Sequence, residues 1–504
     1  MKKFISAALA FVVLTTPAAA LAYGDMMGRA TYWYDDNRNA IPIPDVYTFQ
    51  SLNPVMDMDG ALCEKPADMR AAGDTLYVLD SGTGAVYLLN ERLETVKVIS
   101  SYRDARGGEY ILNGPEGIFI DSDKNLYIAD TQNSRILMCD MDGTVLKVFG
   151  RPEGMIASVD LEAAYLPTKI AVDTAGRMYA ISRNNNLGII SMDSKGEFIS
   201  AIGAPLVSPG VFGSLRLRFM TKEQREQIAR PAPTEFSNLT IDSLNFIYGT
   251  IGSLSVQMIK NTIFSKDMSG NTTPIRKLNM AGNDVLYRKG AYPPIGDLEE
   301  LDGQYSRIVD VALGGNGIYS LLDSNRGRIF TYDNDGNLLF AFGEIGDVKG
   351  ALKNPISIDY FSGRIVVLDS VLRAVSCYQT TDYGALLLGA VGNQYMGEYD
   401  NAYAEWSEII RYNSNYRFAY RGLGYALLKS SQYEKAMNCF EVANDKYHYS
   451  IAYKQQRKIV LGSGFQVIFI CAAALILVLV FYKIVRAVWR YIRGVKVIEN
   501  AGKE

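Results

Sequence analysis

Four aspartates in this chain recur at equivalent places and could act together as ligands. Asp80, Asp130, Asp323 and Asp369 each end a short apolar run, such as the LYIAD of residues 126–130. Carboxylate oxygens are the ligands that Ca²⁺ takes in proteins, so a ring of these acids around one channel would form a cation site. The alternative is that each carboxylate accepts hydrogen bonds from backbone N–H groups of its own turn. Because the placement repeats, we expect this structural role, and we predict no catalytic, cofactor-binding or metal-binding residue.

Histidine and cysteine counts argue against several other chemistries. The 504-residue chain contains a single histidine, His448, whereas most transition-metal sites and most Ser or Cys hydrolase triads need histidine. The five cysteines have no CxxC spacing, and we expect free buried thiols, with one disulfide pair as the open alternative. The cysteines are Cys63, Cys139, Cys377, Cys439 and Cys471, the last of them inside an apolar run.

The aspartates belong to a repeated unit that must position them. Residues 114–150 and 317–343 each contain an apolar run ending in Asp, a polar turn, an Arg-Ile strand start, an Asp-x-Asp-Gly hairpin and a final Phe-Gly. The residues that close the equivalent strand in successive copies are Asp80, Asp130, Ser182, Thr250, Asp323 and Asp369, at intervals of 46 to 73 residues. Three or four strands in such a length are typical of one propeller blade. The sequence therefore predicts a mainly β fold with a six-bladed propeller over residues 23–382.

The strands, the Asp-Gly hairpins and the prolines before the innermost strands together resemble the NHL repeat, a six-bladed β-propeller module. The resemblance covers about residues 45–380 and is weak in the fourth blade, 238–278, which lacks both the Asp and the Arg-Ile. We expect a strand near residues 47–50 to complete the last blade, because a propeller needs its first and last blades joined. Two inserts, 204–235 and 279–304, are expected on one rim, where they either bind a partner or only cover sheet edges.

Propellers related to the NHL module include enzymes, and the resemblance keeps one of them open. Lactonases similar to gluconolactonase hold a divalent metal with Glu, Asn and Asp, while amidating lyases of NHL type bind zinc through several histidines. The single histidine argues against the lyase type, and no residues match the lactonase ligands in place. A surface-displayed, metal-dependent lactonase or esterase is the alternative to a binding protein.

Two groups of large side chains could bind ligands but have a simpler explanation. Arg135, Arg326 and Arg328 follow the aspartate turns, and we expect them to pair with acids of the blades rather than with an anionic ligand. The Tyr-Trp-Tyr cluster at residues 32–34 could stack on sugars, but ordinary packing is expected. Basic residues collect in the terminal segments 1–22 and 483–504, which leaves an acidic body and argues against nucleic acid as a partner.

The ends of the chain predict where the protein lies. Residues 1–22 combine Lys2 and Lys3, an apolar core and small residues up to position 22, which is typical of a signal peptide; an uncleaved anchor is the alternative. Residues 461–482 are 22 uncharged residues, enough for a transmembrane helix of about 33 Å. The basic tail, 483–504, is expected in the cytoplasm and the body outside, by the positive-inside preference. Its membrane-flanking residues are Lys483, Arg486, Arg490 and Arg493.

A second period, of 34 residues, follows the propeller. Residues 383–458 resemble two tetratricopeptide (TPR) repeats, and such a short pair needs a cap, which we place in a helix at 447–458. The residues that carry this resemblance are Tyr399, Ala402 and Trp406, their counterparts Tyr433, Ala436 and Phe440, and the first-helix residues Gly422 and Tyr425.

The order of segments resembles a family of bacterial cell-envelope proteins found in Gram-positive anaerobes, which we associate with sugar-uptake transporters. The resemblance implies a single-pass membrane protein without a cofactor, whose propeller and TPR surfaces bind a protein partner or a glycan. An envelope or transporter component is the expected protein partner, with the lipid bilayer as the other contact. An accessory role beside a sugar-uptake transporter is the more specific expectation.

Overall fold

The computed structural model describes residues 30–153, 165–183, 188–203 and 235–501. The expected signal peptide, 1–22, and nearly all of the insert 204–235 lie outside the described residues. The chain divides into two compact units, Met1–Gly397 and Glu398–Glu504. The division falls after helix α6 (Asp382–Met396), so the first helix of the expected helical segment 383–458 belongs to the same unit as the strands.

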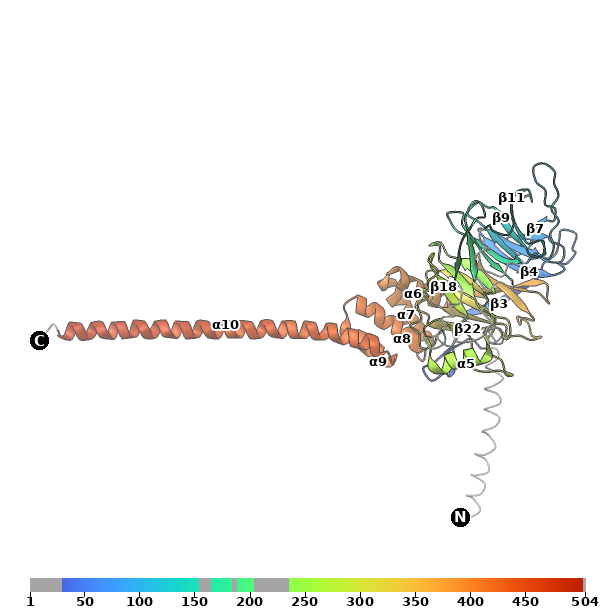
Figure 1. Ribbon diagram of the computed structural model, residues 1–504. Helices are drawn as coiled ribbons and strands as arrows, with labels where there is room; N and C mark the ends of the chain where they lie inside the picture. Colours follow the sequence, from blue (N-terminus) through green and yellow to red (C-terminus); the bar gives the residue numbers. More distant parts are fainter. Residues whose placement is uncertain (1–29, 154–164, 184–187, 204–234, 502–504) are drawn as a thin grey trace, which may run out of the picture. The chain divides into compact units, whose positions relative to one another are not determined.

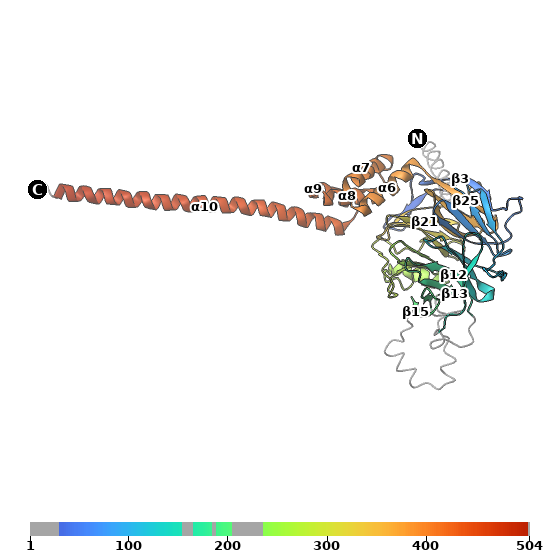
Figure 2. The ribbon, with the colours of Figure 1, turned by 90° about the horizontal axis from the view of Figure 1, so that it is seen from above.

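The first unit is a six-bladed β-propeller, which confirms the predicted fold class (Figure 1 and Figure 2). The first blade consists of β4 (Pro66–Ala72), β5 (Thr75–Asp80), β6 (Val86–Leu89) and β7 (Thr95–Ile99). The second consists of β8 (Gly117–Ile120), β9 (Leu126–Asp130), β10 (Arg135–Cys139) and β11 (Val145–Phe149), with a short 3-10 turn, Thr131–Asn133, after β9. The third consists of β12 (Pro167–Val172), β13 (Met178–Ser182), β14 (Ile189–Met192) and β15 (Phe198–Ile202).

The remaining blades differ from this pattern: the fourth has only three strands, the fifth is extended by strands from the N-terminal segment, and the sixth takes its last strand from that segment. The fourth has three, β16 (Asn238–Ile241), β17 (Ile247–Thr250) and β18 (Ile275–Leu278), with helix α5 (Val256–Ser265) inserted between the last two. The fifth consists of β19 (Ile308–Gly315), β20 (Ile318–Asp323), β21 (Arg328–Tyr332) and β22 (Leu338–Phe342). The sixth consists of β23 (Pro355–Phe361), β24 (Arg364–Asp369), β25 (Ala374–Thr380) and the N-terminal strand β3 (Tyr47–Pro54).

The apolar runs of the sequence are the second strands of the blades. Every residue of β9, and all but the first residue of β24, is buried, because each central strand is covered by the neighbouring blades on both faces. The outermost strand β11 instead exposes its three middle residues. The hairpins that join third and fourth strands need positive φ, as at Gly143 (85°) and Gly336 (80°).

Strand β3 closes the ring. It pairs antiparallel with β25 from Tyr47 opposite Thr380 to Pro54 opposite Ala374. This pairing confirms the expectation that a strand near residues 47–50 completes the last blade. Two more N-terminal strands, β1 (Tyr32–Tyr34) and β2 (Ala40–Pro42), pair with each other and extend the fifth blade to six strands, which the repeat did not predict.

The second unit is helical and contains α7 (Tyr399–Tyr412), α8 (Arg417–Lys429), α9 (Tyr433–Val442) and α10 (Lys446–Ala501). Trp406 and Phe440 are fully buried between these helices. The expected cap, 447–458, and the expected membrane segment, 461–482, are parts of the single helix α10. This helix is long and apolar enough to cross a membrane.

Candidate functional site

The four recurring aspartates are held in separate blades. Each carboxylate is fully buried. Asp80 accepts hydrogen bonds from the backbone N–H of Glu64 (2.8 Å) and Lys65 (2.9 Å), in the loop that leads into its own blade. Burial alone would raise the pKa of Asp80, but these N–H donors outweigh it and lower the pKa.

The other three aspartates make the same kind of contact. Asp130 accepts the N–H of Asn113 (2.8 Å), Asp323 that of Arg307 (2.9 Å) and Asp369 that of Asn354 (2.9 Å). At Asp323 burial dominates, and it raises the pKa of the carboxyl group. In this arrangement each acid joins a turn to the loop that enters its blade.

The arginines after these turns lie against acids. Arg135 Nε is 2.8 Å from Asp130 Oδ2. Arg326 forms an ion pair with Asp297, in the insert 279–304, and Arg328 Nε is 3.5 Å from the same carboxylate. Asp297 is buried, with an exposed fraction of 6%.

The aromatic cluster at residues 32–34 packs on this same acid. The hydroxyl groups of Tyr32 and Tyr34 donate hydrogen bonds to Asp297, and both rings are buried. Asp297, Arg326, Arg328, Tyr32 and Tyr34 are called the Asp297 cluster below. Because the two tyrosines are covered, they offer no stacking face to a sugar.

The first strands of the blades bring together a set of polar residues that sequence reasoning missed. The first strands of the blades approach one another closely enough for direct contacts. Six of their residues are called the channel ring below: Asp68, Gly117, Lys169, Asn238, Asp310 and Ser357. Five of them pair with the residue before the one that closes the second strand, whereas Asn238 pairs with the closing residue Thr250 itself. In four blades the ring residue follows a proline by two residues, at Pro66, Pro115, Pro167 and Pro355, and that spacing is the signal that could have found the ring.

Contacts within the channel ring close the propeller axis. Lys169 Nζ is 2.7 Å from Asp68 Oδ1, and Asn238 Nδ2 donates to Asp310 Oδ1 at 2.6 Å. Ser357 Oγ lies 2.8 Å from Asp310 Oδ2 and donates to it. The free space beside Asp68, Lys169, Asn238 and Asp310 is about 10 Å³, which is about the least that can hold one water molecule.

The channel ring contains two carboxylates, Asp68 and Asp310, and one ammonium group, that of Lys169. Burial raises the pKa of Asp310 to about 6, although the nearby Lys169 works in the opposite direction. Carboxylate, amide and hydroxyl oxygens would suit Ca²⁺, but Asp68 is already paired with the ammonium of Lys169, and Asp310 accepts hydrogen bonds from Asn238 and Ser357. Among the residues that the structure describes, no cluster of three or more His, Cys, Asp or Glu side chains could hold a metal ion.

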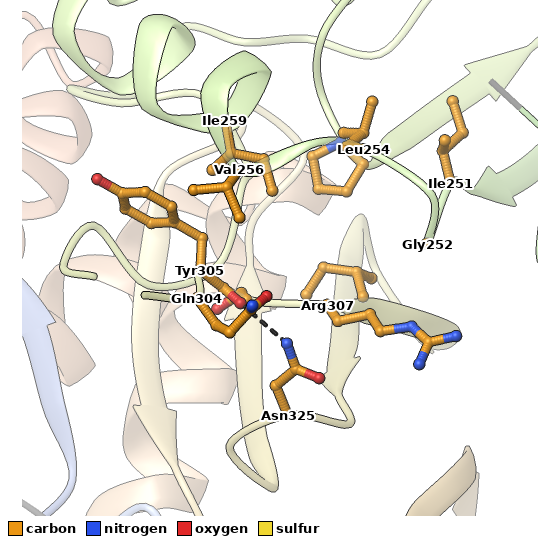
Figure 3. Close-up of a pocket in the computed structure, with 12 residues that line it drawn as sticks. Ile251, Gly252, Leu254, Val256, Ile259, Gln304, Tyr305, Arg307 and Asn325 are labelled. Carbon is orange, nitrogen blue, oxygen red and sulfur yellow. Dashed lines mark hydrogen bonds between the residues drawn. The ribbon is translucent and has the colours of Figure 1, made fainter. Parts of the chain in front are cut away.

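A pocket of about 110 Å³ lies where the fourth blade departs from the repeat. Figure 3 shows Ile251, Leu254, Val256 and Ile259 along one side of it, and Gln304, Arg307 and Asn325 along the other. The first side comes from the segment between β17 and the first turns of α5. The second comes from the end of the insert 279–304, the segment that leads into β19, and the turn after β20. We call it the rim pocket.

The described cysteines carry free thiols, and Cys63, Cys139 and Cys377 are buried. Burial raises the pKa of each of these three thiols, which makes them unreactive at neutral pH.

No family model matches the sequence, and no curated protein matches it. Among solved structures, the selenomethionine-substituted virginiamycin B lyase from Staphylococcus aureus is 10% identical, with a TM-score of 0.40, over 66% of this chain and 100% of that one. A streptogramin B lyase is 10% identical over 67% of this chain and 100% of its own, with a TM-score of 0.39. A protein of unknown function from Bacteroides thetaiotaomicron is 11% identical over 70% and 76%, with a TM-score of 0.39. Likenesses of this size carry no conclusion about chemistry or ligand.

Proposed function

We propose that this protein is a membrane-anchored, extracytoplasmic binding or assembly protein whose propeller and helical surfaces contact a protein or glycan partner. The observation that carries the proposal is the closed channel ring. The Lys169–Asp68 pair and the Asn238–Asp310–Ser357 contacts join the first strands of the blades, and the space of about 10 Å³ beside Asp68, Lys169, Asn238 and Asp310 is too small for a substrate. The features that distinguish this propeller from a plain repeat lie instead on the fourth and fifth blades.

The membrane anchor and its orientation are part of the proposal. Helix α10 supplies the apolar length, and five basic residues follow its apolar segment between positions 483 and 496. Three basic residues, Lys454, Arg457 and Lys458, precede that segment. The excess on the C-terminal side supports a cytoplasmic tail and an extracytoplasmic propeller, with residues 1–22 as the signal peptide.

The NHL and TPR resemblances support the more specific parts of the proposal. Buried Trp406 and Phe440 contact glycines of α8, since a Cβ atom at Gly422 would lie 2.3 Å from Trp406 Cε2 and one at Gly424 2.8 Å from Phe440 Cε1. Such close helix packing is in keeping with TPR-like repeats. Together with the order of segments, it supports an accessory role beside a sugar-uptake transporter.

The alternative, a metal-dependent lactonase or esterase, is not better supported. Such a hydrolase needs a divalent cation with an open coordination position next to a substrate. In the channel ring, the ammonium of Lys169 lies 2.7 Å from Asp68, where it would repel that cation. Bound Ca²⁺ in the purified protein, together with lactone hydrolysis, would favour this alternative.

Site-specific photocrosslinking in intact cells tests the proposal. A benzophenone amino acid replaces Leu301, an exposed residue of the insert 279–304, and in a matched variant it replaces Val96, which is equally exposed on the outer strand of the first blade. We expect the Leu301 variant to capture a membrane or envelope protein, such as a transporter component, that the Val96 variant does not. Recovery of no membrane or envelope protein from either variant would contradict the proposal.

A further inference from the structure

We infer that residues 483–493 of helix α10, called the tail helix below, bind an anionic phospholipid surface through the phosphate groups of its lipids. The inference rests on the membrane anchor of the proposed function. It adds the class of lipid that the C-terminal end of this anchor recognises.

The charges of the tail helix lie on one face. An α-helix turns by about 100° per residue, which places four basic side chains of this segment within an arc of about 80°. They are Lys483, Arg486, Arg490 and Arg493, and all four are exposed. The sequence has no acidic residue between Asp445 and Glu499. The basic face therefore has no acid three or four residues away with which to pair, and its charge is available to an anionic surface.

The opposite face of the tail helix is apolar and also exposed. Its large apolar side chains occupy the arc from about 80° to about 240° around the helix from Lys483. Their exposed fractions run from 47% to 74%. In order around the helix they are Tyr491, Ile484, Val488, Ile492, Val485 and Trp489. One basic and one apolar face are typical of a helix in the interface of an anionic membrane, whereas the apolar segment 461–482 is typical of a span.

Aromatic side chains lie at both edges of the apolar face, with Tyr491 on one side and Trp489 on the other. Tyr and Trp are enriched at the level of the lipid headgroups, because one part of each ring system is apolar and another part is polar. The guanidinium carbon of Arg493 lies 3.8 Å from the centre of the Trp489 ring. This contact holds a positive charge at the border of the two faces, where lipid phosphates would lie.

The other flank of the apolar segment lacks this arrangement. Lys454, Arg457 and Lys458 also share one side of α10, but Gln455 and Gln456 interrupt the side opposite to them. A charged flank that only ends a membrane span needs no apolar face. The apolar face of the tail helix is therefore the feature that indicates contact with a lipid surface.

The length of α10 fits this location. Residues 461–493 belong to one continuous helix (Figure 1), and at 1.5 Å per residue they extend over about 50 Å. A bilayer is about 30 Å thick in its hydrocarbon core and about 40–45 Å with its headgroup regions. Transmembrane helices tilt by up to about 40°, and such a tilt would keep the tail helix within the headgroup region. An upright helix would instead carry the apolar face of its last turns into water.

Trp489 reports directly on this location. The full-length protein is reconstituted into vesicles of phosphatidylcholine alone, or of three parts phosphatidylcholine and one part phosphatidylglycerol. Both leaflets of a vesicle have the same composition, so the result does not depend on the orientation of the inserted protein. Subtracting the fluorescence of a Trp489→Phe variant isolates Trp489 from Trp33 and Trp406. We expect acrylamide to quench Trp489 at least twofold less in the anionic vesicles, and about 1 M salt to reduce this difference.

Variants at the two flanks test whether the tail helix is responsible. The tail variant should give the same quenching in both kinds of vesicle; its substitutions are Arg486→Gln, Arg490→Gln and Arg493→Gln. The matched control removes three charges from the other flank and should keep the difference; its substitutions are Lys454→Gln, Arg457→Gln and Lys458→Gln. Thermal melting shows whether each variant is folded.

A third variant separates the apolar face from the charge. Val485→Gln combined with Val488→Gln keeps all four basic residues, and it should raise the quenching of Trp489 in the anionic vesicles to the level in phosphatidylcholine. Unchanged quenching in this variant would show that charge alone holds the segment, which overturns the inference.

The remaining outcomes distinguish the inference from the membrane anchor itself. Equal quenching of the native protein in the two kinds of vesicle overturns the inference, as does a difference that persists in the tail variant. Loss of the difference in the matched control also overturns it, because charge at either flank would then suffice. A protein that does not float with phosphatidylcholine vesicles after alkaline extraction would refute the anchor, and with it the inference. Equal quenching in a protein that does float would refute the inference alone.

Discussion

Replacing Asp297 by asparagine should destabilise the propeller far more than removing an exposed acid from the same blade. The side chains of Asp297 and Arg326 are only 8% and 6% exposed, and Arg328 beside them is 15% exposed. Asparagine keeps the shape of the side chain but leaves both guanidinium groups without their carboxylate. The two tyrosine hydroxyls would then donate to a neutral oxygen instead of a charged one.

The expected magnitude follows from the burial of these groups. Removing one partner of a buried ion pair costs about 3–5 kcal/mol. A domain is usually stable by only about 5–15 kcal/mol, so Asp297→Asn would remove a large share of this margin. The matched control is Asp335→Asn, since Asp335 lies 3.5 Å from Lys289 with exposed fractions of 50% and 66%. Exposed pairs of this kind contribute about 1 kcal/mol or less.

Denaturant unfolding of the full-length protein in detergent measures the global change, and hydrogen exchange locates it. The amides of β1 and β2 should lose protection first, because Tyr32 and Tyr34 are the side chains that bind Asp297. The reasoning is refuted if Asp297→Asn lowers the free energy of unfolding by less than about 1 kcal/mol, or no more than Asp335→Asn does.

Three further predictions concern the helical unit, the channel ring and the topology. Gly422→Ala should destabilise the second unit by about 1–3 kcal/mol although alanine favours helices, because the new Cβ would overlap Trp406. Thermal unfolding followed by circular dichroism measures this loss of stability. The control is Gly150→Ala, because the space around the Cβ position of Gly150 is open. Since burial raises the pKa of Asp310 to about 6, above its unfolded value, the folded state binds this proton more tightly, and the free energy of unfolding should rise as pH falls from about 6 to about 4. Asp310→Asn should flatten the profile in this window by up to about 1.4 kcal/mol per pH unit, and parallel profiles would contradict the assignment. A membrane-impermeant maleimide should label Asp59→Cys in intact cells but Arg493→Cys only after permeabilisation, and the reverse pattern would invert the proposed topology.

The repeats allowed the propeller to be predicted from the sequence, whereas the elements that depart from the repeat were not predicted. Strands such as β9 and β24 stand out because they are buried on both faces and therefore apolar throughout. Ring closure by β3 follows from the need to join the ends of any propeller. Strands β1 and β2 have three residues each, too few for an alternating pattern. Helix α5 contains several β-branched residues and no acidic residue in its first turn, so its sequence does not stand out as helical.

The candidate sites were harder to predict for a related reason. The residues of the channel ring are Asp, Gly, Lys, Asn, Asp and Ser in chain order, so no single residue type marks them along the chain. The bond between Tyr32 and Asp297 joins residues 265 positions apart. Arg307 lines the rim pocket together with residues of the segment 251–259, and no repeated spacing in the sequence marks that arrangement.

Closure of the ring by β3 and β25 also bears on how this protein would be exported and how it would carry force. The strand that seals the propeller leaves the ribosome first, yet its partner belongs to the last blade, so the ring stays open until the whole repeat region has been made. After assembly, β25 is joined to α6 by a single residue, Thr381, and is hydrogen-bonded to β24 on one side and β3 on the other. Tension transmitted along the chain from a membrane anchor would therefore act on β25 and its pairing with β3 before it reaches any other blade.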